Sequence, residues 1–140
     1  MRETEMHKFQ LVIGGKLVDG AGTMDVVNPA TEKTVAVCPV ADEAQLNAAV
    51  AAAKAAFPAW SERPAAERSA LIGKLADALE ARLGEFASLL TSEQGKPLDQ
   101  AQYEVMGSVF TLRAFAGMHI EPKVLRDDGQ NKVVELRSPL

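Results

Sequence analysis

The candidates for covalent or acid–base chemistry are Cys38, Glu93 and Glu104. Cys38 lies in an alternating, strand-like run with no histidine close in sequence and no helix N-terminus to activate it, so a buried structural thiol is expected. Glu93 and Glu104 could form an acid–base pair, but one ends a predicted helix and the other begins the next, so surface or capping carboxylates are the favoured interpretation. With His7 and His119 as the only histidines, the sequence offers no ligand set for zinc.

Glycine-rich stretches are the other chemical candidates, because a phosphate-binding loop needs glycines just ahead of a helix. Gly14–Gly15 and Gly20–Gly22 lack the spacing of a dinucleotide or P-loop motif and are interpreted as turns. Gly95-Lys96-Pro97 follows a predicted helix, so Gly95 is expected to be its C-cap and Lys96 a favourable charge beside the helix C-terminus. Residue chemistry alone therefore predicts no catalytic or phosphate-binding constellation.

The composition is that of an ordinary globular chain. Of its 140 residues 47% are hydrophobic and 24% charged, and 15 Lys and Arg against 19 Asp and Glu give a formal net charge of −4. Without a basic excess, nucleic acid is not an expected partner. The start of the chain lacks the apolar core of an export signal, and no stretch reaches the roughly 20 apolar residues of a membrane helix. A single cysteine excludes an internal disulfide, so a reducing, cytoplasmic setting is expected.

The hydrophobic pattern predicts strands at both ends of the chain. Two short β-rich runs around Gly14–Gly15 predict a hairpin, and residues 34–40 predict a further strand after the Asn28–Pro29 turn. Val124–Leu125 and residues 133–136 flank a turn-forming segment and predict a second hairpin. The last strand alternates apolar and charged residues, so one of its faces should be buried and needs a cover.

Three amphipathic helices are predicted between the hairpins. The first begins at an Asp42 N-cap, where Gln45 completes a capping box, and should end at Pro58. Its apolar positions step by four, three and four residues along one face: Leu46, Val50, Ala53 and Phe57.

The second predicted helix begins near Pro64, which suits a first helical turn, and ends at Gly95. An apolar stripe runs along residues 72–90, and Gly84 is the candidate for a break within it. The third predicted helix follows the spacing of Ala101, Val105, Val109 and Leu112 and continues to about Gly117.

A set of individually weak motifs becomes informative through its order and spacing. It comprises Ile13-Gly14-Gly15, Asn28-Pro29-Ala30-Thr31, Phe57 with Trp60, Arg68 after Ala66-Glu67, Glu93 with Gly95-Lys96-Pro97, Glu104, and Arg137-Ser138-Pro139-Leu140. With these motifs, residues 9–140 resemble the N-terminal portion of the NAD(P)-dependent aldehyde dehydrogenase superfamily.

The resemblance implies an α+β segment with an N-terminal β-hairpin and strand, three amphipathic helices and a C-terminal β-hairpin arm. This segment would form the outer part of an aldehyde dehydrogenase cofactor domain, which is α/β and Rossmann-like. Residues 1–8 are then expected to be a disordered N-terminus, and residues 9–140 an incomplete N-terminal part of the domain.

The chemistry implied by the resemblance is oxidation of an aldehyde to a carboxylic acid through a cysteine thiolate, with hydride transfer to NAD or NADP. The catalytic cysteine, the catalytic glutamate and the cofactor loop of the family have no counterpart in these residues, and Cys38 does not match the catalytic position. We therefore expect no complete NAD(P) site and no activity from this chain alone.

Three further expectations rest on the resemblance. Tyr103 and Gly107 correspond to helix positions beside the aldehyde entrance tunnel and are candidate substrate-access residues. Carbonyl oxygens of Val26 or Val27 and the Glu93 carboxylate would contribute to a structural monovalent-cation site. The C-terminal hairpin resembles an oligomerisation arm whose strand edge another subunit covers.

Two functional hypotheses follow. In the first, the chain is the N-terminal piece of an aldehyde dehydrogenase and is inert alone. In the second, it is a noncatalytic interaction or oligomerisation module that docks on itself or on full-length aldehyde dehydrogenase subunits through the C-terminal hairpin. An aldehyde is an expected partner only of a complete enzyme, and no membrane partner is expected; a coincidental motif match is the remaining alternative.

Overall fold

The strands form three separate two-stranded antiparallel sheets in the computed structural model, which describes residues 9–119 and 122–136. The sheets pair β1 with β2, β3 with β4, and β5 with β6. The strands are β1 (Leu11–Ile13), β2 (Lys16–Val18), β3 (Gly22–Val27), β4 (Thr34–Val40), β5 (Lys123–Asp127) and β6 (Lys132–Glu135). Both predicted hairpins and the strand at residues 34–40 are confirmed, whereas the expected disorder of residues 1–8 lies outside the described residues.

Four helices lie between the strand pairs, where three were predicted. They are α1 (Glu43–Ser61), α2 (Ala65–Ala81), α3 (Leu83–Gln94) and α4 (Leu98–Ala116). The break in the long middle helix falls at Arg82, two residues before Gly84, where φ and ψ of −113° and 19° depart from helical values. Arg82 is suited to this position because its guanidinium binds Glu85 in the first turn of α3, at 2.8 Å, and lies over the ring of Phe86.

The prediction that Pro58 ends the first helix is wrong, because α1 continues to Ser61 with Pro58 inside it. Proline removes one amide donor, but its carbonyl still accepts hydrogen bonds. The Ser61 hydroxyl donates to the Pro58 carbonyl at 2.8 Å, and the Glu62 amide donates to it at 3.0 Å. Near a helix end, these bonds hold the last turn together in spite of the missing donor.

The helical part of the core is built almost entirely from small side chains. Helix α4 packs against both α2 and α3. The buried helical residues are Ala76 on α2, Ala87 on α3, and Ala101, Val105 and Val109 on α4, which confirms the predicted inner face of the last helix. Alanines let helix axes approach closely but bury little apolar area, so close packing stabilises this bundle more than the amount of apolar surface does.

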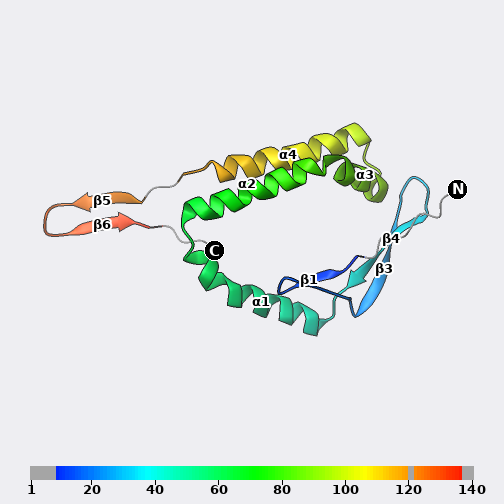
Figure 1. Ribbon diagram of the computed structural model, residues 1–140, viewed down its shortest axis with the longest axis horizontal. Helices are drawn as coiled ribbons and strands as arrows, with labels where there is room; N and C mark the ends of the chain where they lie inside the picture. The colour runs from blue at the N-terminus through cyan, green and yellow to red at the C-terminus, as the bar shows by residue number, and fades with distance from the viewer. Residues whose placement is uncertain (1–8, 120–121, 137–140) are drawn as a thin grey trace.

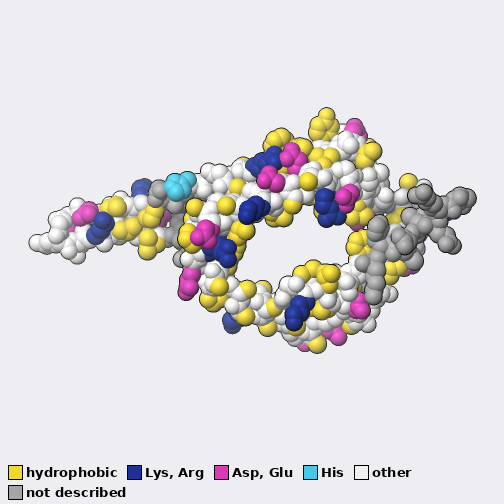
Figure 2. Space-filling model, viewed as in Figure 1, with side chains coloured by type: hydrophobic (Ala, Val, Ile, Leu, Met, Phe, Trp, Pro, Cys, Tyr) yellow, Lys and Arg dark blue, Asp and Glu magenta, His cyan; other side chains and the backbone are white. Residues whose placement is uncertain are grey.

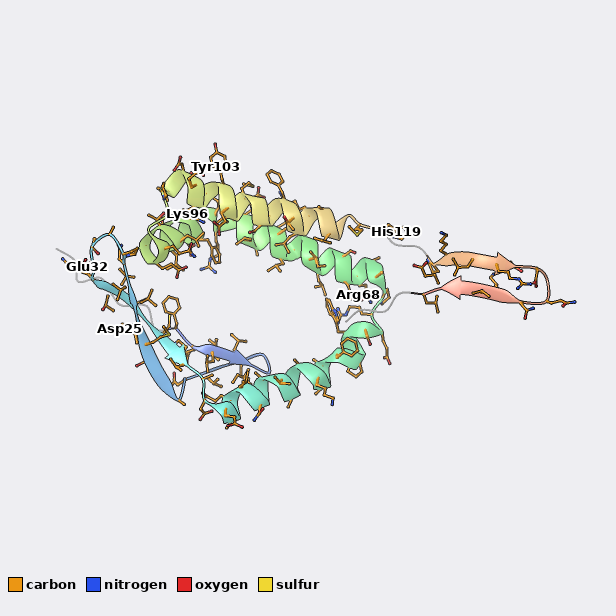
Figure 3. The ribbon with its side chains drawn as sticks, turned by 180° about the vertical axis from the view of Figure 1, so that it is seen from behind. Asp25, Glu32, Arg68, Lys96, Tyr103 and His119 are labelled. Atoms are coloured by element: carbon orange, nitrogen blue, oxygen red, sulfur yellow. The ribbon has the colours of Figure 1, made fainter. Side chains whose placement is uncertain are left out.

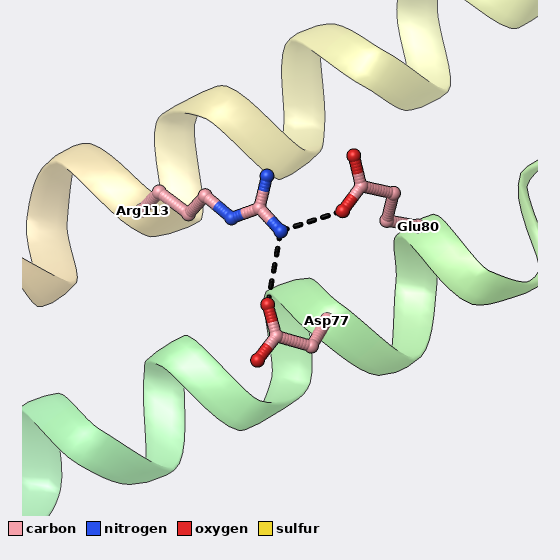
Figure 4. Close-up of polar contacts among 3 residues, drawn as sticks. All are labelled: Asp77, Glu80 and Arg113. Carbon is pink, nitrogen blue, oxygen red and sulfur yellow. Dashed lines mark hydrogen bonds and ion pairs between the residues drawn. The ribbon is translucent and has the colours of Figure 1, made fainter.

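An ion-pair cluster fixes the register of α4 on α2 (Figure 4). One nitrogen of the Arg113 guanidinium donates to Asp77 at 2.9 Å and to Glu80 at 2.6 Å. Hydrogen bonds to Glu80 and then Asp77 raise the pKa of Arg113 above its ordinary value. Because these side chains are exposed, the cluster contributes orientation more than stability.

The start of α1 is connected to the strands through Gln45. The predicted capping box is confirmed: the Gln45 amide donates to the Asp42 carboxylate at 2.8 Å, and the Asp42 amide donates to the Gln45 side chain at 3.2 Å. The same Gln45 side chain donates to the Asp19 carbonyl at 2.8 Å and accepts from the Ala21 amide at 3.1 Å. One amide group therefore joins the helix N-terminus to the connection between β2 and β3.

The apolar face predicted for α1 is exposed. Leu46 is 59% exposed, Val50 58% and Phe57 41%. The helix instead contacts β1 through another side. Gln45 and Ala48 line a groove of about 360 Å³ beside the first hairpin, and Ala52 lies next to Gly14. The predicted apolar residues do share one side of α1, but no described part of the chain covers that side.

The chain surrounds an opening instead of a closed core. In Figure 1, α1 and the first hairpin lie on one side, the α2–α4 bundle lies on the other, and the β3–β4 sheet closes one end. The space-filling view in Figure 2 shows the opening passing through the molecule, with hydrophobic side chains on its rim. The chain exposes 11020 Å², whereas a compact monomer of this mass would expose about 7,000 Å².

The C-terminal hairpin projects past the end of α4 (Figure 1). Its turn is held by the Asp128 carboxylate, which accepts from the amides of Asn131 at 2.7 Å and Gln130 at 3.1 Å, and these bonds lower the pKa of Asp128. All of β5 is exposed, and Leu136 is 75% exposed. On the face of the last strand that was expected to be buried, Val134 of β6 is half-buried, whereas Leu136 is uncovered by the described residues. None of the described helices has the length and apolar content that crossing a membrane requires.

Candidate functional site

The residues first considered for covalent chemistry lie on three different elements: Cys38 on β4, Glu93 on α3 and Glu104 on α4. Cys38 is half-buried on β4, opposite Met24 of β3, so it is less enclosed than predicted. Glu104 is bound by the ammonium of Lys96 (labelled in Figure 3), which supports a structural role for this carboxylate. Within residues 9–119 and 122–136, no cluster of three or more His, Cys, Asp or Glu side chains could hold a metal ion.

Two segments far apart in sequence meet where the β3–β4 turn reaches the junction of α3 and α4. Gly95 ends α3 with φ +72°, and its amide donates to the Thr91 carbonyl at 3.0 Å, which confirms the predicted C-cap. A Cβ atom placed on Gly95 would lie only 2.9 Å from Cγ of Pro29. The Asn28–Pro29 turn and the Glu93-to-Gly95 helix end, which the resemblance brought together, are therefore in close contact.

The turn itself is shaped by Asn28. Its side-chain oxygen accepts from the amides of Ala30 at 2.8 Å and Thr31 at 3.2 Å, which is the usual Asx-turn pattern. Just before it, the register of β3 on β4 shifts between Val26 and Val27. A bulge of this kind leaves the ladder irregular and can redirect a carbonyl out of the sheet.

Substituting Gly95 with alanine should destabilise the protein for two separable reasons. A left-handed conformation costs a non-glycine residue about 1–2 kcal/mol, and the new methyl group would also be pressed against Pro29. We expect a total loss of about 2–4 kcal/mol in urea unfolding.

Gly129→Ala is the matched control for Gly95→Ala. Gly129 has φ +82°, yet a Cβ there meets nothing within 4 Å, so this variant carries the backbone cost alone. Equal losses in the two variants would contradict the close contact between Gly95 and Pro29.

The predicted cation ligands are the carbonyl oxygens of Val26 or Val27 and the carboxylate of Glu93. Oxygen atoms of these kinds are the ligands that a hard monovalent cation prefers. Glu93 is exposed at the end of α3 and makes no hydrogen bond or ion pair with any described residue. The Thr91 hydroxyl oxygen is buried and has no hydrogen-bond partner in the described part of the chain. Thr91 was not predicted, because a threonine inside a helix gives no sequence signal for an unpartnered hydroxyl.

Tyr103 and Gly107 lie one turn apart on the outer side of α4. Tyr103 is 73% exposed and points away from the rest of the chain (Figure 3). A Cβ on Gly107 would meet nothing within 4 Å, and Phe110, three residues further on, is 63% exposed. This face is an open apolar strip, on which the absence of a side chain at Gly107 leaves a shallow gap.

Arg68, one of the resemblance motifs, holds the connection between the first two helices (Figure 3). Its guanidinium donates to the carbonyls of Ser61, at 3.4 Å, and Arg63. Both carbonyls lie at or beyond the end of α1, where a helix leaves acceptors unsatisfied. Arg68 is therefore a structural residue that fixes the turn from α1 to α2.

Comparison with known proteins connects this architecture to one family. Residues 17–140 match the family model described as the aldehyde dehydrogenase family. A curated protein of Pseudomonas sp., described as a probable aldehyde dehydrogenase, is 38% identical over 133 residues, which are 94% of this chain and 27% of that protein.

Solved structures give the same result. The crystal structure of PnpE in complex with nicotinamide adenine dinucleotide is 39% identical with a TM-score of 0.81, over 88% of this chain and 26% of that chain. An NAD-dependent aldehyde dehydrogenase from Sinorhizobium meliloti is 34% identical with a TM-score of 0.83, over 89% and 26%. The chain therefore spans about a quarter of the length of these relatives. With the family model matching most of its residues, the chain belongs to the aldehyde dehydrogenase family and corresponds to the N-terminal segment of its members.

Proposed function

We propose that this chain is the N-terminal scaffold segment of an NAD(P)-dependent aldehyde dehydrogenase and is catalytically inert without the rest of the subunit. The observation that carries the proposal is the family match over residues 17–140, in a chain that spans about a quarter of the length of its relatives. The aldehyde-oxidising groups and most of the cofactor site would then come from the remaining part of the subunit.

The helix N-termini support this division of roles. A dinucleotide is held in this type of domain by free backbone N–H groups at a helix N-terminus. At the start of α1 this position is occupied by the Asp42 cap, whose negative charge opposes a phosphate. We derive no reaction step through the cofactor.

The direct test is an aldehyde oxidation assay on the isolated chain. With NAD or NADP and short-chain aliphatic and aromatic aldehydes, we expect no production of reduced nicotinamide above the level without protein. Turnover that scales with the concentration of the chain and survives Cys38→Ala would contradict the proposal. Turnover lost in Cys38→Ala would contradict it as well, and would assign the thiol a catalytic role.

We also propose that Glu93 and the carbonyls of Val26 and Val27 form part of a monovalent-cation site. The contact of Gly95 with Pro29 supports this proposal because it brings both segments together, and Glu93 has no competing ion pair among the described residues. Potassium should then raise the unfolding midpoint of the chain above its value in choline chloride of equal ionic strength, because a ligand that binds only the folded state stabilises it.

Glu93→Gln should remove this potassium effect while leaving the midpoint in choline nearly unchanged. Glu62→Gln, which changes an exposed carboxylate beyond α1, is the control and should keep the effect. A potassium effect of the same size in all three proteins would identify general salt stabilisation and overturn the site.

Substrate access is the role we propose for Tyr103 and Gly107 in a complete subunit. Their exposure on the outer strip of α4, together with Phe110, supports an apolar channel wall formed with residues outside this chain. The same complete subunit would use NAD or NADP, and the cytoplasm is the proposed compartment.

The second candidate function is a noncatalytic module that docks on another copy or on full-length family subunits. The exposure of every β5 residue favours it, since a two-stranded hairpin with open edges readily adds a further strand. Retention of an intact family enzyme on the immobilised chain would support this function, provided that deletion of residues 123–135 abolishes it. A monodisperse monomer with no retention would remove this function.

A further inference from the structure

The exposed side of α1 carries a regular seam of apolar residues from Leu46 to Trp60, and the same spacing continued toward the helix N-terminus reaches Glu43. The five positions Leu46, Val50, Ala53, Phe57 and Trp60 alternate steps of four and three residues. All five are exposed, and the four larger side chains range from 59% exposed for Leu46 to 38% for Trp60. A stripe with this spacing is the pattern by which one helix packs lengthwise against another. We call these five residues the α1 seam.

The α1 seam is distinct from the side by which α1 contacts its own hairpin. Gln45, Ala48 and Ala52 face the β1–β2 hairpin. With about 100° of rotation per residue, these residues point about 120° away from the α1 seam. The helix is therefore held to the strands by one side and presents a second, unused packing side.

The residues beside the seam indicate what kind of partner it fits. Paired identical helices usually carry complementary Glu and Lys at the flanking positions. Here the flanking residues are Asn47, Ala49, Lys54 and Ala56, of which only Lys54 is charged. The alanines on one flank allow close apolar packing, as inside a domain, and a single lysine on the other provides no complementary charge pairing between two copies of the chain.

We propose that the α1 seam docks an amphipathic helix from the remaining three quarters of an aldehyde dehydrogenase subunit, and that the two parts can associate when supplied as separate chains. This inference rests on the proposed function and extends it to a defined surface. The seam lies within the matched residues 17–140, and the relatives have about three quarters of their length outside the match. The exposed area of 11020 Å² leaves ample surface for such an association.

The test is coexpression of the tagged 140-residue chain with the Sinorhizobium meliloti relative from which the matching segment has been deleted. We expect the unmodified chain to retain the deleted relative in a soluble one-to-one complex on the affinity column. Val50→Glu and Phe57→Glu should each lower the amount of complex by about tenfold or more, because a charge at the centre of an apolar contact weakens association strongly. Ala55→Glu, an exposed position on the opposite side of α1, should leave the complex unchanged.

A second measurement keeps the test independent of the folding of the variants. Trp60 is the only tryptophan in the chain, so the 19F NMR signal of 5-fluorotryptophan reports on the α1 seam alone. We expect it to shift and broaden when the partner is added, and circular dichroism should show unchanged helix content in Val50→Glu and Phe57→Glu.

The outcomes separate the seam from the proposed function. A complex that withstands both seam substitutions and leaves the Trp60 signal unmoved would overturn the seam as the docking surface and leave the proposed function standing. No complex with the unmodified chain would overturn the inference that the two parts associate, and would leave the proposed function to the oxidation assay. A homodimer of the chain that the seam substitutions abolish would overturn the chosen partner in favour of a second copy.

Discussion

Replacing Val109 with aspartate should abolish the cooperative thermal unfolding of the helical bundle. Val109 is completely buried, on the helix that packs against both α2 and α3. A carboxylate at this position would be buried without a partner, which costs several kcal/mol. Domains of this size are stable by only about 5–15 kcal/mol, and the alanine-rich core of this one offers little reserve. Circular dichroism at 222 nm during heating is the measurement.

Two companion variants calibrate the Val109→Asp result. Val109→Ala removes two methyl groups without adding charge and should cost about 2 kcal/mol, with a lower but still cooperative midpoint. Val124→Asp introduces the same carboxylate on β5 at a position that is 50% exposed and should change the midpoint little. A sharp transition near the original midpoint in Val109→Asp would show that α4 does not form the centre of the bundle.

Gly20→Ala should be the most destabilising of the simple glycine substitutions outside the turns. A Cβ atom on Gly20 would lie 2.8 Å from each of three atoms: the Gly22 carbonyl oxygen, Cβ of Pro39 and the Val40 amide nitrogen. Two of these belong to the backbone of the β3–β4 sheet and cannot rotate away. Overpacking of this kind typically costs about 1–3 kcal/mol, and the upper end is expected here.

Gly22→Ala is the matched control, two residues away. A Cβ on Gly22 meets nothing within 4 Å, so this change should be neutral or slightly stabilising in urea unfolding. If both variants lost the same stability, the cause would be a general preference for glycine in this loop and not the close approach of β4 to Gly20.

Features determined by neighbours in sequence were predictable. The Asp42–Gln45 capping box, the left-handed Gly95 that ends α3 and the tight turn at Gly14 and Gly15, with φ of +58° and +75°, all follow from a few consecutive residues. Each is stabilised by hydrogen bonds or backbone preferences that operate within about one turn, so the same residues favour the same structure in almost any context.

Features that depend on distant residues were missed. The sequence identified Gln45 as a cap but gave no sign of its bonds to Asp19 and Ala21, which are 26 and 24 residues away. The break at Arg82 instead of Gly84 depends on a competition between helix propensity and the Arg82–Glu85 pair, which propensity alone does not resolve. The continuation of α1 past Pro58, where the Ser61 hydroxyl donates to the Pro58 carbonyl, was likewise missed.

The candidate site was accessible only through the resemblance. Nothing in the types of Val26 or Tyr103 suggests a function, because a carbonyl ligand is independent of the side chain and an exposed tyrosine is common on helices. What the structure adds is proximity: the contact of Gly95 with Pro29 joins two segments that lie 66 residues apart in sequence. The roles of Val26, Val27, Glu93, Tyr103 and Gly107 stay predictions.

The opening between α1 and the α2–α4 bundle leaves hydrophobic side chains in contact with water. A polypeptide with such exposed apolar surface is a target for chaperones and for proteases that recognise apolar segments. We therefore expect the cellular abundance of the chain to follow the concentration of the partner that covers this surface. When that partner is scarce, the chain should be degraded rapidly.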